Sequence, residues 1–262
     1  MTKAQTKLVK ALFLDYDGTI SPINPSESNS NVLHQNETVL QAISQKIPIA
    51  IITTKDLPFI IKRTPFAHAW AGIAGLETKT RNALENRMDV KKAAPHIEAA
   101  LKYASALAGE GLNIEKKKRF TNGDIIAFSV DWRQADNQNS ALKKASRILT
   151  YCETLPLVTV KYEKHPFLDV FPCHVDKGQA LLTLKEKLEL PDGILYMGDS
   201  DLDNSAFKKA DVAVGVIHGE NPPNLQCDFY VKFEDVPNFL RHLLQNDFRI
   251  NSHSENKHRL KF

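Results

Sequence analysis

Short apolar runs, each ended by polar or glycine residues, recur in the first third of the chain. Residues 8–14 (LVKALFL) and 47–52 (IPIAII) are two such runs. Runs of this length without alternation are typical of buried strands in a parallel sheet. Segments with helical spacing follow them, at 32–44 and 57–63. This alternation of strands and helices predicts a parallel sheet covered by helices on both faces.

The same texture returns in the last third of the chain. A helix is expected over 178–188 and a buried strand over 193–197 (GILYM). The remaining elements expected in this part are a helix over 203–210, strands over 212–216 and 229–231, and a helix over 236–245. We therefore expect the first and last thirds to build one sheet together.

The middle of the chain has a different pattern. Residues 81–109 are charged and helix-rich, and residues 140–155 have helical spacing. Two strand-like stretches flank Asn122-Gly123, a pair that favours positive φ at both positions and therefore predicts a hairpin. We interpret this region as an inserted α+β domain.

The predicted fold class is α/β, with a Rossmann-like three-layer core and an inserted α+β cap. The core takes residues 1–77 and 166–250, the cap takes 78–165, and the polar residues 251–262 form a flexible tail. The length of 262 residues suits one core domain with a smaller companion.

Charge and composition exclude several classes of protein. Lys and Arg total 34 against 31 Asp and Glu, so no global basic field favours nucleic acid. No apolar stretch approaches the roughly 20 residues that span a membrane. The three cysteines are far apart and lack zinc-site spacing, which indicates free thiols. We expect a cytoplasmic protein, a monomer or small homo-oligomer, without nucleic-acid or membrane partners.

Acidic residues follow the first apolar run directly, as Asp15-x-Asp17-Gly18-Thr19. Two carboxylates at a strand end can divide chemical work, one attacking phosphorus and the other handling the proton of the leaving group. Gly18 permits a tight turn and can expose amides to phosphate oxygens. A simple Asp-Gly turn is the alternative.

A second acidic cluster follows the strand over 193–197. Gly198, Asp199, Asp201 and Asp203 lie within six residues. Closely spaced carboxylates at a strand end suit a hard cation such as Mg²⁺, which binds through oxygen. Favourable charge at a helix N-terminus is the alternative for Asp203.

Lys177 stands at the start of a predicted helix, where its charge opposes the helix dipole. Its position is easier to understand if the ammonium faces anions, and a solvated surface lysine is the alternative. Thr53, at the end of the run over 47–52, offers a hydroxyl and an amide to a phosphate oxygen.

This ordered set of residues resembles the haloacid dehalogenase superfamily of phosphatases. The resemblance implies that Asp15 is the nucleophile and Asp17 the general acid and base. It also implies phosphate binding by Thr53, Thr54 and Lys177. The Mg²⁺ ligands it implies are Asp15, the Asp17 carbonyl and Asp199, with Gly198 and Asp203 supporting them.

Further motifs are similar to those of trehalose-6-phosphate phosphatases. They include the opening LDYDGTISP at 14–22, the loop AGIAGLE at 71–77 and GDSDLDNSAF at 198–207. The resemblance to their cap motifs implies that Glu115, Lys117 and Arg133 contact substrate. The expected reaction is therefore Mg²⁺-dependent hydrolysis of a small sugar phosphate, with trehalose 6-phosphate first among the candidates.

The chain departs from that family pattern in three places. Thr53-Thr54-Lys55 replaces Ser-Gly-Arg, Asp131 replaces the His of an HYR motif, and the segment 169–172 (DVFP) lacks an arginine. Thr-Thr-Lys is also similar to mannosyl-3-phosphoglycerate phosphatases. A phosphotransferase or mutase, and a binding module without activity, stay open as alternatives. The basic run at 116–119 has two interpretations: a solvated hairpin edge that its charge protects from pairing with another strand, or substrate recognition by Glu115 and Lys117.

Overall fold

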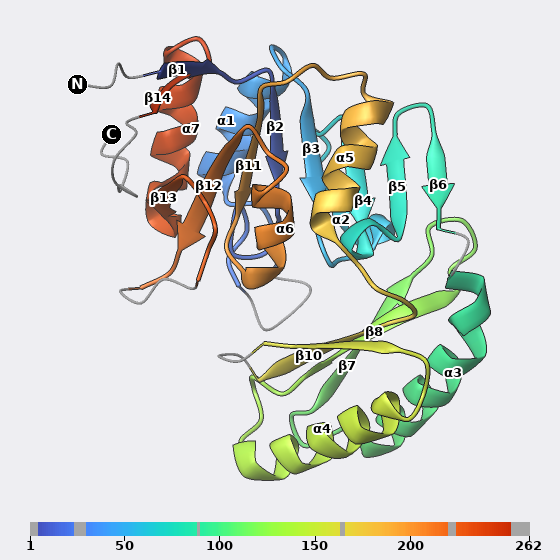
Figure 1. Cartoon of the computed structure of the whole chain (residues 1–262). Helices are drawn as coiled ribbons and strands as arrows, with labels where there is room; N and C mark the ends of the chain where they lie inside the picture. The colour runs from blue at the N-terminus through green and yellow to red at the C-terminus, as the bar shows by residue number, and fades with distance from the viewer. Residues whose placement is uncertain (1–4, 24–29, 88–89, 163–165, 220–223, 253–262) are drawn as a thin grey trace. The chain divides into compact units, whose positions relative to one another are not determined.

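The computed structural model describes residues 5–23, 30–87, 90–162, 166–219 and 224–252. The chain forms two compact units (Figure 1). The first consists of Met1–Thr54, Phe59–Glu85 and Asp176–Phe262, and the second of Lys55–Pro58 and Asn86–Val175. The assignment of residues 78–165 as a cap stays a prediction.

The first unit contains an eight-stranded sheet with the order β13-β12-β11-β2-β3-β4-β5-β6. Its strands are β2 (Ala11–Leu14), β3 (Ile49–Ile52), β4 (Ala69–Gly72), β5 (Glu77–Thr80), β6 (Leu84–Asn86), β11 (Ile194–Gly198), β12 (Val212–Ile217) and β13 (Phe229–Lys232). Strands β13 to β4 pair in parallel, and β5 runs antiparallel to β4. The predicted α/β class with a mostly parallel sheet is confirmed.

Helices cover both faces of this sheet (Figure 1). They are α1 (His34–Ser44), α2 (Leu57–Arg63), α5 (Lys177–Lys187), α6 (Asn204–Phe207) and α7 (Val236–Gln245), with short 3-10 turns η2 (Ile73–Gly75), η3 (Asp201–Asp203) and η4 (Phe233–Asp235). Leu181 and Leu184 of α5 pack with Phe13 and Ile52 of the sheet on one side. No helix in the described part of the chain is long and apolar enough to cross a membrane.

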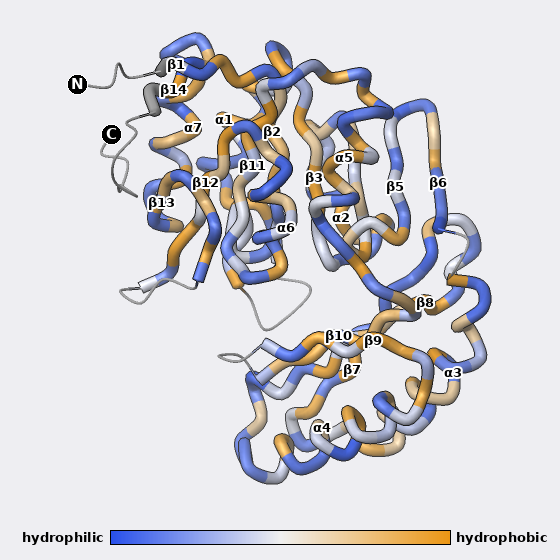
Figure 2. Tube along the Cα trace, viewed as in Figure 1, coloured by the Kyte–Doolittle hydropathy of each residue, from blue (hydrophilic) through white to orange (hydrophobic). Residues whose placement is uncertain are grey.

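The parallel strands are apolar on both faces because helices bury both. All four residues of β2 and of β3 are buried, and Figure 2 shows these strands in the hydrophobic colour. Strands β5 and β6 are more polar (Figure 2). The sequence pattern placed residues 81–86 in the helix-rich middle, and that prediction is wrong, since β6 occupies Leu84–Asn86.

The sheet reverses its order of strands between β2 and β11. From β2 the chain adds β3 and β4 on one side, and from β11 it adds β12 and β13 on the other. In open α/β sheets, ligands bind outside the carboxyl ends of the strands at such a reversal. Residues that directly follow β2 and β11 therefore occupy the position best suited to a binding site.

The predicted strand over 8–14 is two strands. β1 (Gln5–Leu8) pairs antiparallel with β14 (Arg249–Ser252), and β2 joins the large sheet. The chain changes partners between them, because the Val9 amide donates to Phe248 O and the Lys10 amide donates to Gly193 O. Strand β14 includes the first two residues of the predicted tail, and residues 253–262 lie outside the described residues.

The second unit has a four-stranded antiparallel sheet with the order β7-β8-β10-β9. Its elements are β7 (Asn113–Lys118), β8 (Ile125–Asp131), β9 (Val158–Lys161), β10 (Phe167–Phe171), α3 (Val90–Leu107) and α4 (Gln138–Glu153). Ile97 of α3 and Ile148 of α4 pack in one core with Phe128, Val130 and Leu168 of the sheet. All three cysteines of the chain are free thiols, as predicted.

The hairpin between β7 and β8 differs from the two-residue turn that Asn-Gly predicts. Gly123 has a φ of 76°, whereas Asn122 is not among the residues with positive φ in the described part of the chain. The Gly123 amide donates to Arg119 O, and the Arg119 amide donates to Asp124 O. The loop therefore spans residues 119–124, and only Gly123 needs positive φ.

Candidate active site

Three chain segments bring their acidic and basic side chains to the reversal point of the large sheet. Asp15 follows β2, Asp199 follows β11, and Lys177 is the first residue of α5. Leu14 and Met197 are paired in register, so the residues that follow them leave the sheet side by side. The structure thus brings Asp15 together with Lys177, 162 positions later in the sequence, and with Asp199, 184 positions later.

The ammonium of Lys177 lies between two carboxylates. Its Nζ donates to Asp15 Oδ1 at 2.8 Å and to Asp203 Oδ1 at 2.7 Å. Lys177 is 3% exposed, so these contacts lie away from water. The Asp176 side chain accepts hydrogen bonds from the amides of Gly178 and Gln179 and thereby caps α5. The cap fixes the start of the helix at Lys177.

Asp203 has both carboxylate oxygens saturated by donors. Oδ1 accepts from Lys177 and from the Tyr196 hydroxyl at 2.6 Å, and Oδ2 accepts from the amides of Asp199 and Ser200 and from the Ser200 hydroxyl. A Cβ at Gly198 would lie 2.3 Å from Asp203 Cγ, so only glycine leaves room for this carboxylate. Asp203 therefore ties the end of β11 to Lys177 at the start of α5.

Negative charge exceeds positive charge in this cluster. Carboxylate oxygens of Asp15, Asp199 and Asp203 lie within 4.8 Å of one another, with the one ammonium of Lys177 against Asp15 and Asp203. Burial raises the pKa of Asp15 to about 7, although the Lys177 charge opposes that rise. Burial, together with Asp15 and Asp203, also raises the pKa of Asp199 well above its usual range.

The pKa of Lys177 moves in the opposite direction from that expected of a buried amine. Burial alone lowers it, but the charges of Asp15 and Asp203 outweigh burial, and the pKa is raised. Lys177 therefore remains an ammonium at every physiological pH. Its single charge does not neutralise the acids around it, and a hard divalent cation between Asp15 and Asp199 fits this donor set of carboxylate oxygens.

The loop after Asp15 presses directly against Asp199. Gly18 has a φ of 76°, and a Cβ there would lie 1.9 Å from Asp199 Oδ2. The Gly18 amide donates to Ser21 O at 2.7 Å, so this amide is engaged within the loop. The expectation that the turn exposes amides to phosphate stays a prediction. The Gly18 carbonyl lies 2.8 Å from Nε2 of His218, a residue at the end of β12.

The second predicted catalytic acid is held by a serine. The Ser30 hydroxyl donates to Asp17 Oδ1 at 2.8 Å, and Ser30 is buried. Thr53 is also buried, and its amide donates to Ala71 O within the sheet. Thr54 follows it directly on the same loop. The roles of Asp17, Thr53 and Thr54 stay predictions.

The residues predicted to contact substrate lie in the second unit and are paired there. Lys55 Nζ donates to Glu115 Oε1 at 3.0 Å. Lys117 Nζ donates to Asp169 Oδ1 at 2.8 Å. Arg133 makes two bonds to the Asp131 carboxylate, from Nε at 3.0 Å and from Nη2 at 2.8 Å. Their predicted contacts with substrate remain untested by this geometry.

Sequence reasoning missed Ser30, Tyr196 and His218. Each is a single polar residue, and no second polar residue at a recognisable spacing makes it part of a sequence motif. Tyr196 lies inside the apolar run over 193–197, and His218 follows the strand β12. The signal available for His218 was its place at a strand end, the same signal that identified Asp15 and Asp199.

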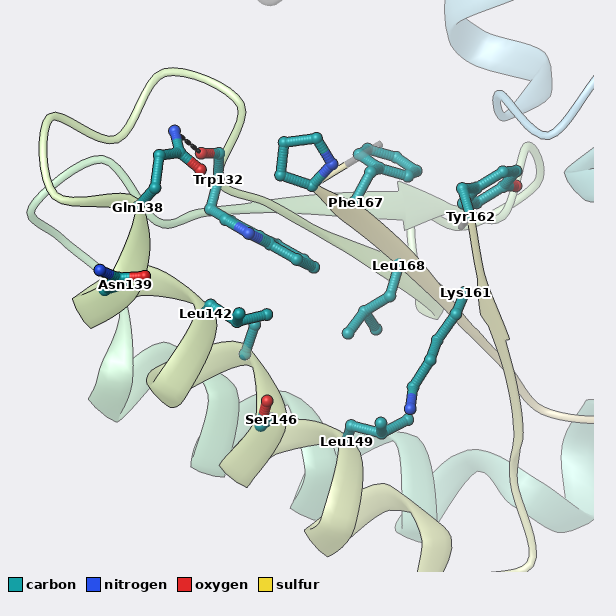
Figure 3. A pocket seen from close by; sticks show the side chains of 12 residues that line it. Trp132, Gln138, Asn139, Leu142, Ser146, Leu149, Lys161, Tyr162, Phe167 and Leu168 are labelled. Atoms are coloured by element: carbon teal, nitrogen blue, oxygen red, sulfur yellow. Dashed lines mark hydrogen bonds between the residues drawn. The ribbon is translucent and has the colours of Figure 1, made fainter. Parts of the chain in front are cut away.

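A pocket of about 510 Å³ lies within the second unit (Figure 3). Figure 3 shows Trp132, Leu142 and Leu168 turned toward one space, with Lys161 at its side. Its lining contains no Asp, Glu or His. The strand-end cluster, which gathers three carboxylates and one ammonium, is therefore the better candidate for chemistry.

Comparison with known proteins shows a family match over most of the chain. Residues 13–222 match the family model described as trehalose-phosphatase. This span includes Asp15, Lys177, Asp199 and Asp203. The match therefore covers every member of the acidic cluster.

Individual relatives are distant. The chain is 28% identical over 227 residues to an uncharacterized glycosyl hydrolase of Mycobacterium tuberculosis, which covers 80% of this chain and 16% of that protein. It is 25% identical over 214 residues to trehalose-phosphate phosphatase B of Arabidopsis thaliana, covering 75% of this chain and 55% of the relative. The chain thus spans about half or less of the length of these relatives.

A solved structure shares the fold. The C-terminal domain of the C. albicans trehalose-6-phosphate phosphatase superposes with a TM-score of 0.70 at 19% identity, covering 91% of this chain and 93% of that one. The family model covers most of the chain and the whole acidic cluster. The chain therefore belongs to the trehalose-phosphatase family.

Proposed function

We propose that this chain hydrolyses the phosphate ester of a small sugar, trehalose 6-phosphate in the first place, through a phosphoryl group carried on Asp15. One observation carries the proposal. A buried carboxylate and a buried ammonium, 2.8 Å apart, meet a second acid at the reversal point of the sheet. In this proposal Asp15 is the nucleophile, and the neighbouring ammonium offsets its repulsion from an anionic phosphoryl group.

The acidic cluster fits a resident Mg²⁺. The side chains of Asp15 and Asp199 and the backbone carbonyl of Asp17 would hold it. When bound, the ion supplies positive charge that neutralises the acids and the phosphoryl oxygens. Asp203 takes no place among these ligands, because five hydrogen bonds already occupy its oxygens.

In the first chemical step, a carboxylate oxygen of Asp15 attacks phosphorus. The bond between phosphorus and the sugar oxygen breaks, and Asp17 donates a proton to that departing oxygen. Lys177 holds Asp15 by a charge-assisted hydrogen bond and offers its remaining donor capacity to a phosphoryl oxygen. Thr53 and Thr54 add donors from the end of β3.

In the second step, water attacks the phosphorus of the aspartyl phosphate. Asp17, now ionised, accepts a proton from that water, and the bond between phosphorus and Asp15 breaks. Asp15 returns as a carboxylate and inorganic phosphate leaves. Ser30 donates a hydrogen bond to one oxygen of the Asp17 carboxyl, and in this proposal Asp17 carries out both proton transfers.

The substrate class comes from the family match and from the resemblance in the second unit. Glu115, Lys117 and Arg133 are the proposed contacts to sugar hydroxyls. Asp131 replaces the His of the family motif and Arg133 keeps its Arg, and their paired charges favour a polyhydroxyl ligand that offers both donors and acceptors. A cytoplasmic location is part of the same proposal.

A phosphate-release assay with a panel of sugar phosphates tests the proposal. The panel contains trehalose 6-phosphate, mannosyl-3-phosphoglycerate and sucrose 6-phosphate, each with Mg²⁺ and with EDTA. We expect Mg²⁺-dependent release from one of them, fastest from trehalose 6-phosphate. Absence of release from every phosphomonoester would overturn the hydrolase, and transfer of phosphate to an added sugar in preference to water would indicate a phosphotransferase.

A further inference from the structure

His218 approaches the candidate active site from a third strand end. It follows β12, which pairs in parallel with β11, the strand that delivers Asp199. Its Nε2 lies 2.8 Å from the carbonyl oxygen of Gly18. Because a carbonyl only accepts, Nε2 must carry the hydrogen of this bond.

The imidazole ring is fixed on a second side. It stacks on Phe233 of η4, with ring centroids 4.9 Å apart and planes inclined by 29°. Its Nε2 is 3.8 Å from Asp199 Oδ2, which is beyond hydrogen-bond distance. The hydrogen bond from His218 is therefore directed at the Gly18 backbone, and its contact with Asp199 is electrostatic.

A hydrogen bond to the Gly18 carbonyl restrains the most flexible backbone position of this loop. The backbone of glycine has the greatest conformational freedom of any residue type, and the Gly18 φ of 76° lies in the left-handed region. The bond from the Gly18 amide to Ser21 O sets the peptide plane that carries the Asp17 carbonyl, because the two groups of a trans peptide point in opposite directions. The bond from His218 sets the next peptide plane.

We propose that His218 is a positioning residue for the cation site, a role that rests on the proposed function. It holds the backbone of Gly18 against Asp199, so that the Asp17 carbonyl and the carboxylates of Asp15 and Asp199 converge on one ion. Groups that orient metal ligands typically contribute 10-fold to 100-fold in metal affinity. His218 contacts neither the sugar nor the phosphoryl group in this role.

The test compares His218→Ala with His218→Gln, because the side-chain amide of glutamine reaches a similar position and can donate to the same carbonyl. His34→Ala, which removes an exposed histidine at the start of α1, is the control. Two readouts are used, and neither depends on turnover. One is amide hydrogen exchange in the peptide containing residues 15–21, without metal. The other is the Mg²⁺ concentration that gives half of the maximal thermal stabilisation.

In His218→Ala we expect faster exchange in that peptide and a half-maximal Mg²⁺ concentration about tenfold higher. His218→Gln and His34→Ala should stay within about twofold of the unmodified chain, well below that tenfold loss. Unchanged exchange in His218→Ala would overturn the hydrogen-bond role. Faster exchange with unchanged Mg²⁺ affinity would overturn the role in the cation site. If the unmodified chain shows no stabilisation by Mg²⁺, the proposed metal site itself fails, and this inference fails with it.

Discussion

Each unit of the molecule buries one lysine against an aspartate at the same distance of 2.8 Å, yet the two pairs have different surroundings. In the second unit, Lys117 meets Asp169, whose carboxylate also accepts from the hydroxyls of Ser129 and Tyr162. Lys117 is the cation bonded to this carboxylate, and two neutral hydroxyls also donate to it. In the first unit, Lys177 faces Asp15 and Asp203 together, with Asp199 beside them.

The difference teaches how to separate a structural ion pair from a site that awaits a ligand. A balanced pair with satisfied oxygens has no need of another charge. An excess of buried carboxylates raises pKa values, as burial does for Asp15 and Asp199, and a cation relieves the excess. The predictions below test whether the first unit alone behaves in this way.

The largest expected effect is on turnover by Asp15→Asn. Loss of the attacking carboxylate should lower Mg²⁺-dependent phosphate release about a thousandfold or more. Asp201→Asn, which neutralises an exposed acid close by in the sequence, is the matched control and should keep activity within about twofold, because exposed charges interact weakly. If Asp15→Asn were as active as the unmodified chain, Asp15 would be excluded as the nucleophile.

Removal of either buried lysine should destabilise the fold, but Mg²⁺ should distinguish the two. Lys177→Met and Lys117→Met each leave buried carboxylate behind, at a cost of about 3 to 5 kcal/mol. Mg²⁺ should recover part of the loss in Lys177→Met and none of it in Lys117→Met. Calorimetric melting of both variants, with and without Mg²⁺, measures this, and equal recovery in both would remove the contrast between the units.

Stabilisation by Mg²⁺ should grow as pH rises. The pKa of Asp15 is raised from 3.8 to about 7 without metal, so the folded chain keeps a proton that the unfolded chain has lost. Asp15 therefore makes the metal-free protein less stable as pH increases from about 4 to 7. Bound Mg²⁺ requires the ionised carboxylate and competes with that proton.

The shift in melting temperature on adding Mg²⁺ should accordingly be small at pH 5.5 and largest above pH 7. Melting curves across this range, repeated with Asp15→Asn, provide the measurement. The variant should lose much of the pH dependence. A shift in the unmodified chain that is constant with pH would argue against the Asp15 carboxylate as a ligand.

The smallest expected effect is that of Ser30→Ala. The hydroxyl of Ser30 makes one hydrogen bond to Asp17, and a bond to a charged group is worth roughly 1.5 kcal/mol. If Asp17 transfers the proton, kcat should fall by about tenfold, because 1.4 kcal/mol corresponds to a factor of ten. KM should change little. A raised KM with unchanged kcat would place Asp17 in binding instead.

The parallel core was predictable because both its faces are buried. The uninterrupted apolar runs over 47–52 and 193–197 carry that signal directly, and the residues that follow them lie at the carboxyl edge by the rules of the fold. This is why Thr53 and Asp199 could be selected without coordinates, and Asp15 likewise from the apolar run before it, whereas Lys177 was selected from its place at a helix start and from the family resemblance. The convergence of Lys177 on both Asp15 and Asp203 required the structure, since it depends on the angle at which α5 begins.

Other features carry too weak a local signal. β5 and β6 are polar strands at one end of the sheet, and the pairing of β5 with β4 is set by tertiary contacts. The partner of β1 is β14, at the far end of the described chain. The sequence pattern of neither segment predicts that the two pair. The Asn122-Gly123 pair favoured a tight turn, but the hydrogen bond from Gly123 to Arg119 closes a longer loop.

The central claim is that Asp15 carries the phosphoryl group, and chemical trapping tests it most directly. The enzyme is mixed with Mg²⁺ and the best substrate of the panel and quenched with borohydride, which reduces an aspartyl phosphate to homoserine. Mass spectrometry then reads the peptide that contains residues 15 to 21. We predict homoserine at position 15, dependent on both Mg²⁺ and substrate. Phosphate release with Asp15 unmodified, or with reduction at a different carboxylate, would contradict the claim.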